Sequence, residues 1–225
     1  MNQNVIFIGN SIVAGYPWSK GKSFVSVLRR ALKGEETAFS QGDAEAVIGQ
    51  PDFAKNTGFD IINKGVNGDT TAGIAGRFEA DVLAGDPDCV YFMTGTNDFI
   101  YRDATPEKAF ANLQELAEAA EARGITPIYM TPLLVDAGKA ECMWMSGFGI
   151  SYDAVNRDVS NFSELIRGSG RLYVDMNRAF DEYAKAFDDI DLVYFDGVHP
   201  MPDGHAFMAG EVIRFMDENR NALGL

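Results

Sequence analysis

Short apolar runs separated by amphipathic stretches constrain the fold of this chain more than any other feature. The runs cover residues 5–8, 59–62, 89–93, 125–130 and 172–174, and each has Gly, Asn or Asp on at least one side. Their lack of strict polar–apolar alternation is typical of strands that are buried on both faces of a parallel sheet. Stretches 23–32, 106–122 and 202–219 carry apolar side chains at helical spacing. This alternation predicts an α/β fold with a parallel five-stranded sheet and right-handed crossovers.

Two segments interrupt the alternation. Residues 34–58 are a polar segment between the first predicted helix and the second predicted strand, and residues 135–152 are rich in Gly, Met and aromatic side chains. The second segment directly follows the fourth predicted strand, and ligands in open α/β sheets bind outside the carboxyl ends of the strands. Residues 135–152 are therefore either a wall or lid of a pocket or an irregular loop packed on the core.

The size and charge of the chain narrow the classes of partner. A length of 225 residues suits one domain, and we expect a single domain over residues 1–225. The net charge of −14 disfavours binding to nucleic acid and to anionic membrane surfaces. The start of the sequence lacks the regions of a signal peptide, and no run approaches the roughly 20 apolar residues that cross a bilayer. Cys89 and Cys142 match no disulfide or zinc pattern. We expect a cytoplasmic protein without an integral membrane segment.

A serine follows the first predicted strand. Ser11 lies in the sequence Gly9-Asn10-Ser11, where a tight turn can present its hydroxyl at the carboxyl end of the sheet. A serine hydroxyl is a weak nucleophile until a base takes its proton. Taken alone, Ser11 is weak evidence for a nucleophile, and a turn or helix-cap serine is the favoured interpretation.

The base for such a serine has only two candidates, because the chain contains two histidines. His199 follows Asp196 by three residues, so the carboxylate can hold the imidazole within one compact turn and stabilise its protonated form. His205 lies inside the last predicted helix and is interpreted as structural. Two histidines and one aspartate make a poor zinc set, so we expect neither a metal nor a cofactor.

Donors for a developing oxyanion are present after the second and third strands. Gly68 in the sequence VNGDT can offer a backbone N–H, and Asn97 in GTND can offer a side-chain amide. Each motif alone is ordinary turn chemistry. Because these loops and the loops of Ser11 and His199 all follow parallel strands, we expect them at one edge of the sheet.

Four blocks together resemble the SGNH/GDSL hydrolase family. They are FIGNSIVAG, NKGVNGDT, TGTND and DGVHP, which occur in the order of the family over residues 7–200. The resemblance implies a three-layer α/β/α sandwich similar to flavodoxin. It implies Ser11 as nucleophile, with Asp196 and His199 completing a triad. It also implies an oxyanion hole made by the N–H groups of Ser11 and Gly68 and the amide of Asn97.

The sequence departs from the family at Asn10, where an aspartate is usual. We expect this change to alter loop geometry or pH behaviour and to leave catalysis intact, because the aspartate is not a triad member.

The resemblance and the residues together predict a serine esterase that works through an acyl-enzyme. The expected partner is a small acyl ester, such as a short-chain ester, a lysophospholipid or a thioester. A carbohydrate O-acetyl esterase is the alternative, and a non-catalytic binding module on the same fold is the alternative from another class. Trp144 and the turn Tyr16-Pro17-Trp18 either line an apolar acyl pocket or pack in the core. The oligomeric state is left open.

Overall fold

A parallel sheet of five strands forms the centre of the computed structural model, which describes residues 2–35, 37–42, 44–144 and 149–225. Its strands are β1 (Asn2–Gly9), β4 (Gly58–Gly65), β5 (Cys89–Met93), β6 (Thr126–Met130) and β7 (Tyr173–Val174). The strand order is β4-β1-β5-β6-β7, and all neighbours pair in parallel. The predicted parallel five-stranded sheet is thus confirmed.

The register of the central strands aligns the loops that follow them. Gly9 of β1 pairs with Gly65 of β4 on one side and with Met93 of β5 on the other. β4 lies on one side of β1, and the later strands β5, β6 and β7 lie on the other, so β1 is a topological switch point. Such switch points open a crevice at the carboxyl ends of the strands. The loops that carry Ser11, Gly68 and Asn97 all begin at this crevice.

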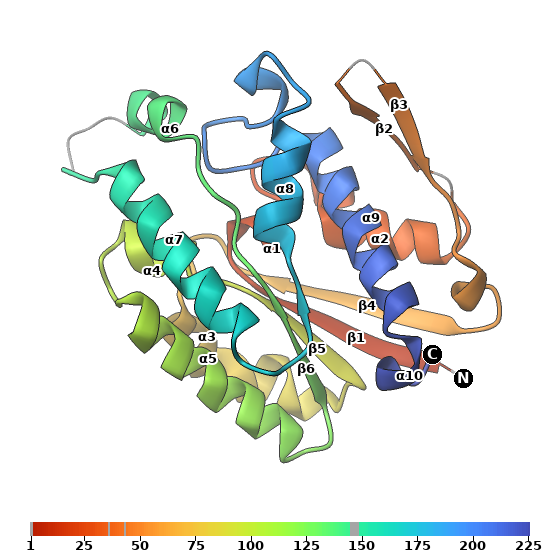
Figure 1. Ribbon diagram of the computed structural model, residues 1–225. Coiled ribbons are helices and arrows are strands. Elements are labelled where there is room, and N and C mark those ends of the chain that lie inside the picture. Colours follow the sequence, from red (N-terminus) through yellow and green to blue (C-terminus); the bar gives the residue numbers. More distant parts are fainter. Residues whose placement is uncertain (1, 36, 43, 145–148) are drawn as a thin grey trace.

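Helices cover both faces of the sheet, as Figure 1 shows. One face carries α2 (Phe24–Leu32), α8 (Met176–Ala184) and α9 (Pro202–Glu218), and the other carries α3 (Thr71–Asp81), α5 (Pro106–Glu121) and α7 (Tyr152–Arg167). The shorter helices are α1 (Ser11–Ala14), α4 (Thr96–Ile100), α6 (Ala137–Met143) and α10 (Arg220–Leu223). The three-layer arrangement confirms the predicted fold class.

The central strands are apolar on both faces because each face of the sheet has its own core, whereas the edge strand β4 alternates buried and exposed side chains over Gly58–Ile62. Val5 and Phe7 of β1 point towards α2 and α9, whereas Ile6 and Ile8 point towards the opposite helix layer. The ring of Phe7 stacks on that of Tyr91 in β5, with centroids 4.5 Å apart. Side chains buried on both faces account for the absence of polar alternation in the sequence.

The structure adds elements that the apolar pattern did not predict. Residues 34–58 contain an antiparallel hairpin of β2 (Thr37–Gln41) and β3 (Ala44–Ile48), which lies beside α9 (Figure 1). Helix α3 was not predicted either, because only Ile74 and Phe78 form its apolar stripe and two glycines interrupt it. Segment 135–152 contains α6, while residues 145–148 lie outside the described part. No helix in the described ranges is long and apolar enough to cross a membrane. A single domain over residues 1–225 stays a prediction.

Candidate active site

Ser11 is presented by a very short helix that lies directly on the strand ends. It is the first residue of α1, and the Asn10 side chain caps this helix by accepting a hydrogen bond of 3.0 Å from the N–H of Ile12. A Cβ on Gly9 would lie 2.7 Å from the Cγ2 of Val13 in α1, and a Cβ on Gly65 would lie 2.2 Å from the nitrogen of Ala14. Only glycine at these two positions lets α1 approach the sheet so closely.

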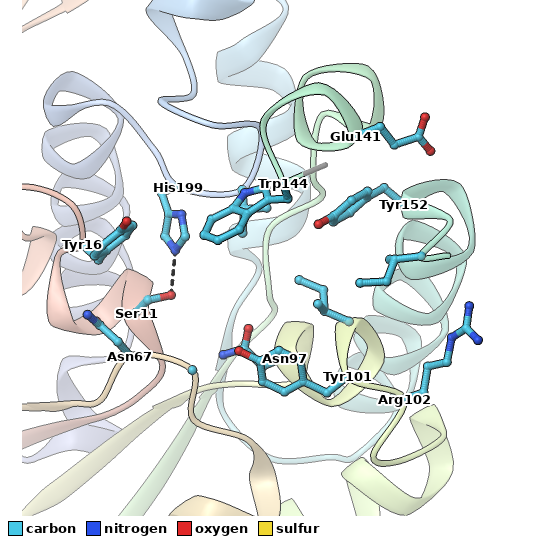
Figure 2. A pocket seen from close by; sticks show the side chains of 14 residues that line it. Ser11, Tyr16, Asn67, Asn97, Tyr101, Arg102, Glu141, Trp144, Tyr152 and His199 are labelled. Atoms are coloured by element: carbon cyan, nitrogen blue, oxygen red, sulfur yellow. Dashed lines mark hydrogen bonds between the residues drawn. The ribbon is translucent and has the colours of Figure 1, made fainter. Parts of the chain in front are cut away.

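The predicted triad residues meet in one hydrogen-bonded line. The Ser11 Oγ lies 2.8 Å from the Nε2 of His199, a hydrogen bond that Figure 2 shows. The Nδ1 of His199 lies 2.7 Å from the Oδ2 of Asp196. All three side chains are buried. With the proton of neutral His199 on Nδ1, the Nε2 is free to accept the proton of the serine hydroxyl.

A compact loop holds Asp196 against His199. Oδ1 of Asp196 accepts the N–H groups of Val198 at 3.0 Å and His199 at 2.8 Å. Gly197 has a φ of +88°, and a Cβ there would lie 2.5 Å from the backbone nitrogen of Ala140 in α6. The loop therefore closes under α6 only with glycine at this position.

The Asp196 carboxylate is stabilised in its charged form. Burial opposes ionisation, but the hydrogen bond and charge of His199, with the two backbone N–H groups, outweigh it and lower the pKa of Asp196 below its ordinary value. The base therefore has a permanently anionic partner at neutral pH.

The second histidine, His205, does not contact Ser11. His205 is fully buried in α9, where its Nδ1 accepts the N–H of Phe24 at 3.3 Å. Burial, and then the charge of His199, lower the pKa of His205 to about 3. Of the two histidines, the structure brings only His199 to the serine.

The expected oxyanion donors lie around the same serine. Gly68 follows β4 with a φ of +77°, and Asn97 is the second residue of α4. The Asn97 Nδ2 donates one hydrogen bond of 2.9 Å to the carbonyl oxygen of Asp69, which fixes the amide and leaves its second N–H for a ligand. Ser11, Gly68 and Asn97 line one cavity.

Asp98 joins the two donor loops, and the sequence interpretation missed it. Its carboxylate accepts the N–H of Thr71 at 3.1 Å and the hydroxyl of Thr71 at 2.5 Å. The same hydroxyl accepts an N–H from Asn112 at 2.9 Å. Burial raises the pKa of Asp98 despite these bonds. The signal in the sequence was its position next to Asn97, where only the amide was considered.

Aromatic side chains surround the base and form much of the cavity, which has a volume of about 680 Å³. The ring centroid of Tyr16 lies 4.8 Å from that of His199. The ring centroid of Trp144, on the α6 side, lies 6.2 Å from the His199 centroid. Figure 2 shows Ser11 and His199 at one end of the cavity and Glu141 and Arg102 at the other.

Segment 135–152 lines this cavity through Glu141, Trp144, Ile150 and Tyr152. Its described part is a pocket wall, which was one of the two interpretations left open. In the turn after the nucleophile, Tyr16 lines the cavity, whereas Trp18 donates its Nε1–H to the carbonyl oxygen of Pro200 at 2.8 Å and braces the loop of the base.

Comparison with known proteins identifies the family of the chain. The family model of the GDSL-like lipase/acylhydrolase family matches residues 7–207. The chain belongs to the GDSL-like lipase/acylhydrolase family. It is a carboxylic ester hydrolase, and the resemblance noted from the four sequence blocks is confirmed.

Relatives of this family share the sequence or the fold over nearly the whole chain. An acetylxylan esterase of Geobacillus stearothermophilus is 28% identical over 224 residues, covering 94% of this chain and 93% of that protein. The crystal structure of a lipase/acylhydrolase from Enterococcus faecalis has a TM-score of 0.69 at 20% identity and covers 96% of both chains. A catalytic mutant of an acetylxylan esterase from Geobacillus stearothermophilus has a TM-score of 0.67 at 23% identity, covering 95% of this chain and 94% of that chain.

The departure from the GDSL pattern at Asn10 has a structural explanation. The capping bond requires an acceptor oxygen, which an amide supplies as a carboxylate does. The helix that presents Ser11 therefore forms without the negative charge. Within the described ranges, no group of three or more His, Cys, Asp or Glu side chains could hold a metal ion.

Proposed function

We propose that this GDSL family member is a serine esterase that hydrolyses small esters with short acyl groups. The single observation that carries the proposal is the hydrogen-bonded line from Ser11 through His199 to Asp196 at one end of the cavity. A non-catalytic binding module would have no need of a buried carboxylate that orients an imidazole towards a serine hydroxyl.

The first half of the reaction forms an acyl-enzyme. Ser11 Oγ attacks the ester carbonyl carbon while the Nε2 of His199 takes the hydroxyl proton. The anionic Asp196 stabilises the imidazolium that results. When the tetrahedral intermediate collapses, His199 gives its proton to the leaving alcohol. In the second half, His199 takes a proton from the water that attacks the acyl carbon, and it gives this proton to the Ser11 Oγ as the bond to the serine breaks and the carboxylic acid leaves.

Three donors would stabilise the oxyanion. The N–H of Ser11 is one of the first-turn groups that a helix leaves without an internal partner. Gly68 contributes a backbone N–H without a side chain in the way, and Asn97 contributes the amide hydrogen that Asp69 does not use. Fixed donors of this kind are worth more at a buried site than in water.

The cavity supports a short acyl group and a larger alcohol. The Tyr101 hydroxyl lies 3.2 Å from the position that a Cβ on Gly68 would occupy, so this hydroxyl limits the space beside the Gly68 N–H. The remaining volume extends past Trp144 and Tyr152 towards Arg102 and Glu141 (Figure 2).

Carbohydrate O-acetyl esters are the second candidate substrate. Trp144 is 45% exposed and Tyr101 is 52% exposed, so both rings offer apolar faces at the mouth of the cavity on which a sugar ring could pack. The 28% identical relative that is an acetylxylan esterase supports the same candidate.

Turnover of a chromogenic acetate ester tests the proposed nucleophile. Ser11→Ala should lower kcat by several orders of magnitude without loss of fold, because triad members act as a unit. Ser160→Ala, which removes a hydroxyl from the exposed side of α7, is the matched control and should keep wild-type turnover. Near-normal turnover in pure Ser11→Ala protein would exclude the mechanism.

A substrate panel separates the substrate classes. Nitrophenyl esters of rising chain length should show kcat/KM falling beyond the shortest acyl groups, and this fall should weaken in Tyr101→Ala. Acetylated xylo-oligosaccharides and a lysophospholipid are measured beside them. A preference for long acyl chains in the wild type would contradict the assignment of a short acyl site.

A further inference from the structure

Arg77 connects two loops of the site from behind the cavity. It lies in α3, its side chain is only 20% exposed, and it is not among the residues that line the cavity. Its Nε and Nη2 contact Oδ2 of Asp69 at 2.8 and 2.7 Å, and its Nη1 contacts Oδ2 of Asp81 at 2.7 Å. Its Nη2 also donates a hydrogen bond of 3.2 Å to the carbonyl oxygen of Gly9.

The Gly9 carbonyl is the last backbone acceptor of β1 before the nucleophile turn. It accepts the N–H of Val66 at 3.0 Å in addition to the Arg77 bond. One guanidinium therefore reaches both the end of the strand that carries Ser11 and the loop that carries Gly68. A planar group with several donors is suited to such a bridge, whereas a lysine ammonium is not.

Asp69 links Arg77 to the oxyanion donors. Its carboxylate binds Arg77, while its carbonyl oxygen accepts the Asn97 amide at 2.9 Å. It also follows Gly68 directly in the chain. The position of Asp69 thus sets both the Gly68 backbone and the rotation of the Asn97 amide.

Gly73 in α3 leaves space for the Asp69 carboxylate because it has no side chain. A Cβ on Gly73 would lie 1.9 Å from Oδ1 of Asp69, whereas a Cβ on Gly76 in the same helix would meet nothing within 4 Å. Glycine is a poor residue for a helix interior. Its presence at position 73 is explained by the space that the carboxylate needs.

We propose that Arg77 and Asp69 form a positioning pair that holds the Gly68 N–H and the Asn97 amide in place relative to Ser11. The inference rests on the proposed function, since it concerns the oxyanion donors of that mechanism. The pair does not contact the substrate. Its loss should affect interactions that strengthen in the transition state, and therefore kcat more than KM.

Kinetics of Asp69→Asn and Arg77→Lys test the pair, with kcat expressed per active site by burst titration. Both variants should lose roughly 10- to 100-fold in kcat with KM within about twofold, as small misplacements of catalytic groups do. Asp81→Asn is the matched control, because it removes the other carboxylate of Arg77 and leaves both loop contacts; its kcat should remain that of the wild type.

A pair of alanine variants provides a second test that leaves every charge in place. Gly73→Ala should lower kcat because the new methyl group displaces the Asp69 carboxylate. Gly76→Ala in the same helix should retain wild-type kcat. Thermal melting of all variants shows whether the fold is kept, and if Arg77→Lys does not fold, the nearly isosteric Asp69→Asn and the alanine pair decide.

The outcomes separate this inference from the proposed mechanism. Wild-type kcat per active site in Asp69→Asn and Gly73→Ala, with Ser11→Ala inactive, overturns the positioning pair alone. Equal losses in Asp81→Asn and Gly76→Ala also overturn it, because they indicate a general effect of α3 stability. Turnover that persists in Ser11→Ala would instead refute the mechanism on which the inference depends.

Discussion

The buried histidine of α9 makes the stability of the protein depend on pH in a predictable direction. Neutral His205 accepts the Phe24 N–H at Nδ1, so protonation there would break this bond and leave a charge in the core. Burial, and then the charge of His199, place the pKa of His205 at about 3 in the folded protein, against about 6.5 for an unfolded imidazole.

The sign and size of the effect follow from proton linkage. Between pH 6.5 and pH 3 the unfolded chain binds a proton at His205 that the folded protein does not bind, so the free energy of unfolding falls as pH falls. Above pH 6.5 the stability from this group is fully present. The slope is at most about 1.4 kcal/mol per pH unit, which gives a loss of about 2–3 kcal/mol from pH 7 to pH 4.5.

Urea unfolding followed by tryptophan fluorescence measures this loss, with His205→Gln as the comparison. The glutamine oxygen can still accept the Phe24 N–H but does not titrate, so the variant should lose about 2–3 kcal/mol less than the wild type between pH 7 and pH 4.5. Between pH 7 and pH 8.5 the two proteins should change alike. Equal acid losses in both proteins would refute the claim that His205 stays neutral in the folded state.

Two further predictions concern catalysis and packing. Asn97→Ala removes one oxyanion donor and should lower kcat roughly 100- to 1000-fold with a much smaller change in KM; steady-state kinetics showing the reverse pattern would move Asn97 to substrate binding. Phe162→Ala removes a fully buried ring that packs against Phe99 and Phe110, and urea unfolding should show a loss of about 3–5 kcal/mol, whereas a loss under 1 kcal/mol would contradict the packing described for α7.

The strands and the reacting residues could be predicted because both leave local signals. All five strands were found as short apolar runs bounded by turn residues, and the central strands β1 and β5 are buried on both faces. Ser11, Gly68 and Asn97 follow strands in short motifs, and parallel strands bring their following loops to one edge. The expectation that the loop of His199 also directly follows a strand was wrong, because α8 lies between β7 and Asp196. Asp196 and His199 were identified from their three-residue spacing instead.

The supporting contacts could not be predicted in the same way. Asp98 binds Thr71 across 27 positions, and Arg77 reaches the carbonyl of Gly9 across 68 positions. Such contacts depend on how α3 packs, and α3 itself has a weak apolar stripe. The hairpin of β2 and β3 was missed because most of its side chains are at least partly exposed, so it carries no buried run.

Labelling with a fluorophosphonate tests the central claim most directly, because this probe reacts only with a serine that an adjacent base activates. Peptide mapping of the wild-type protein should place one label on Ser11, with esterase activity lost in proportion to the labelled fraction. Labelling should disappear in Ser11→Ala and persist in Ser160→Ala. A label on another serine, or full inactivation with Ser11 unmodified, would contradict the assignment of Ser11 as the nucleophile activated by His199.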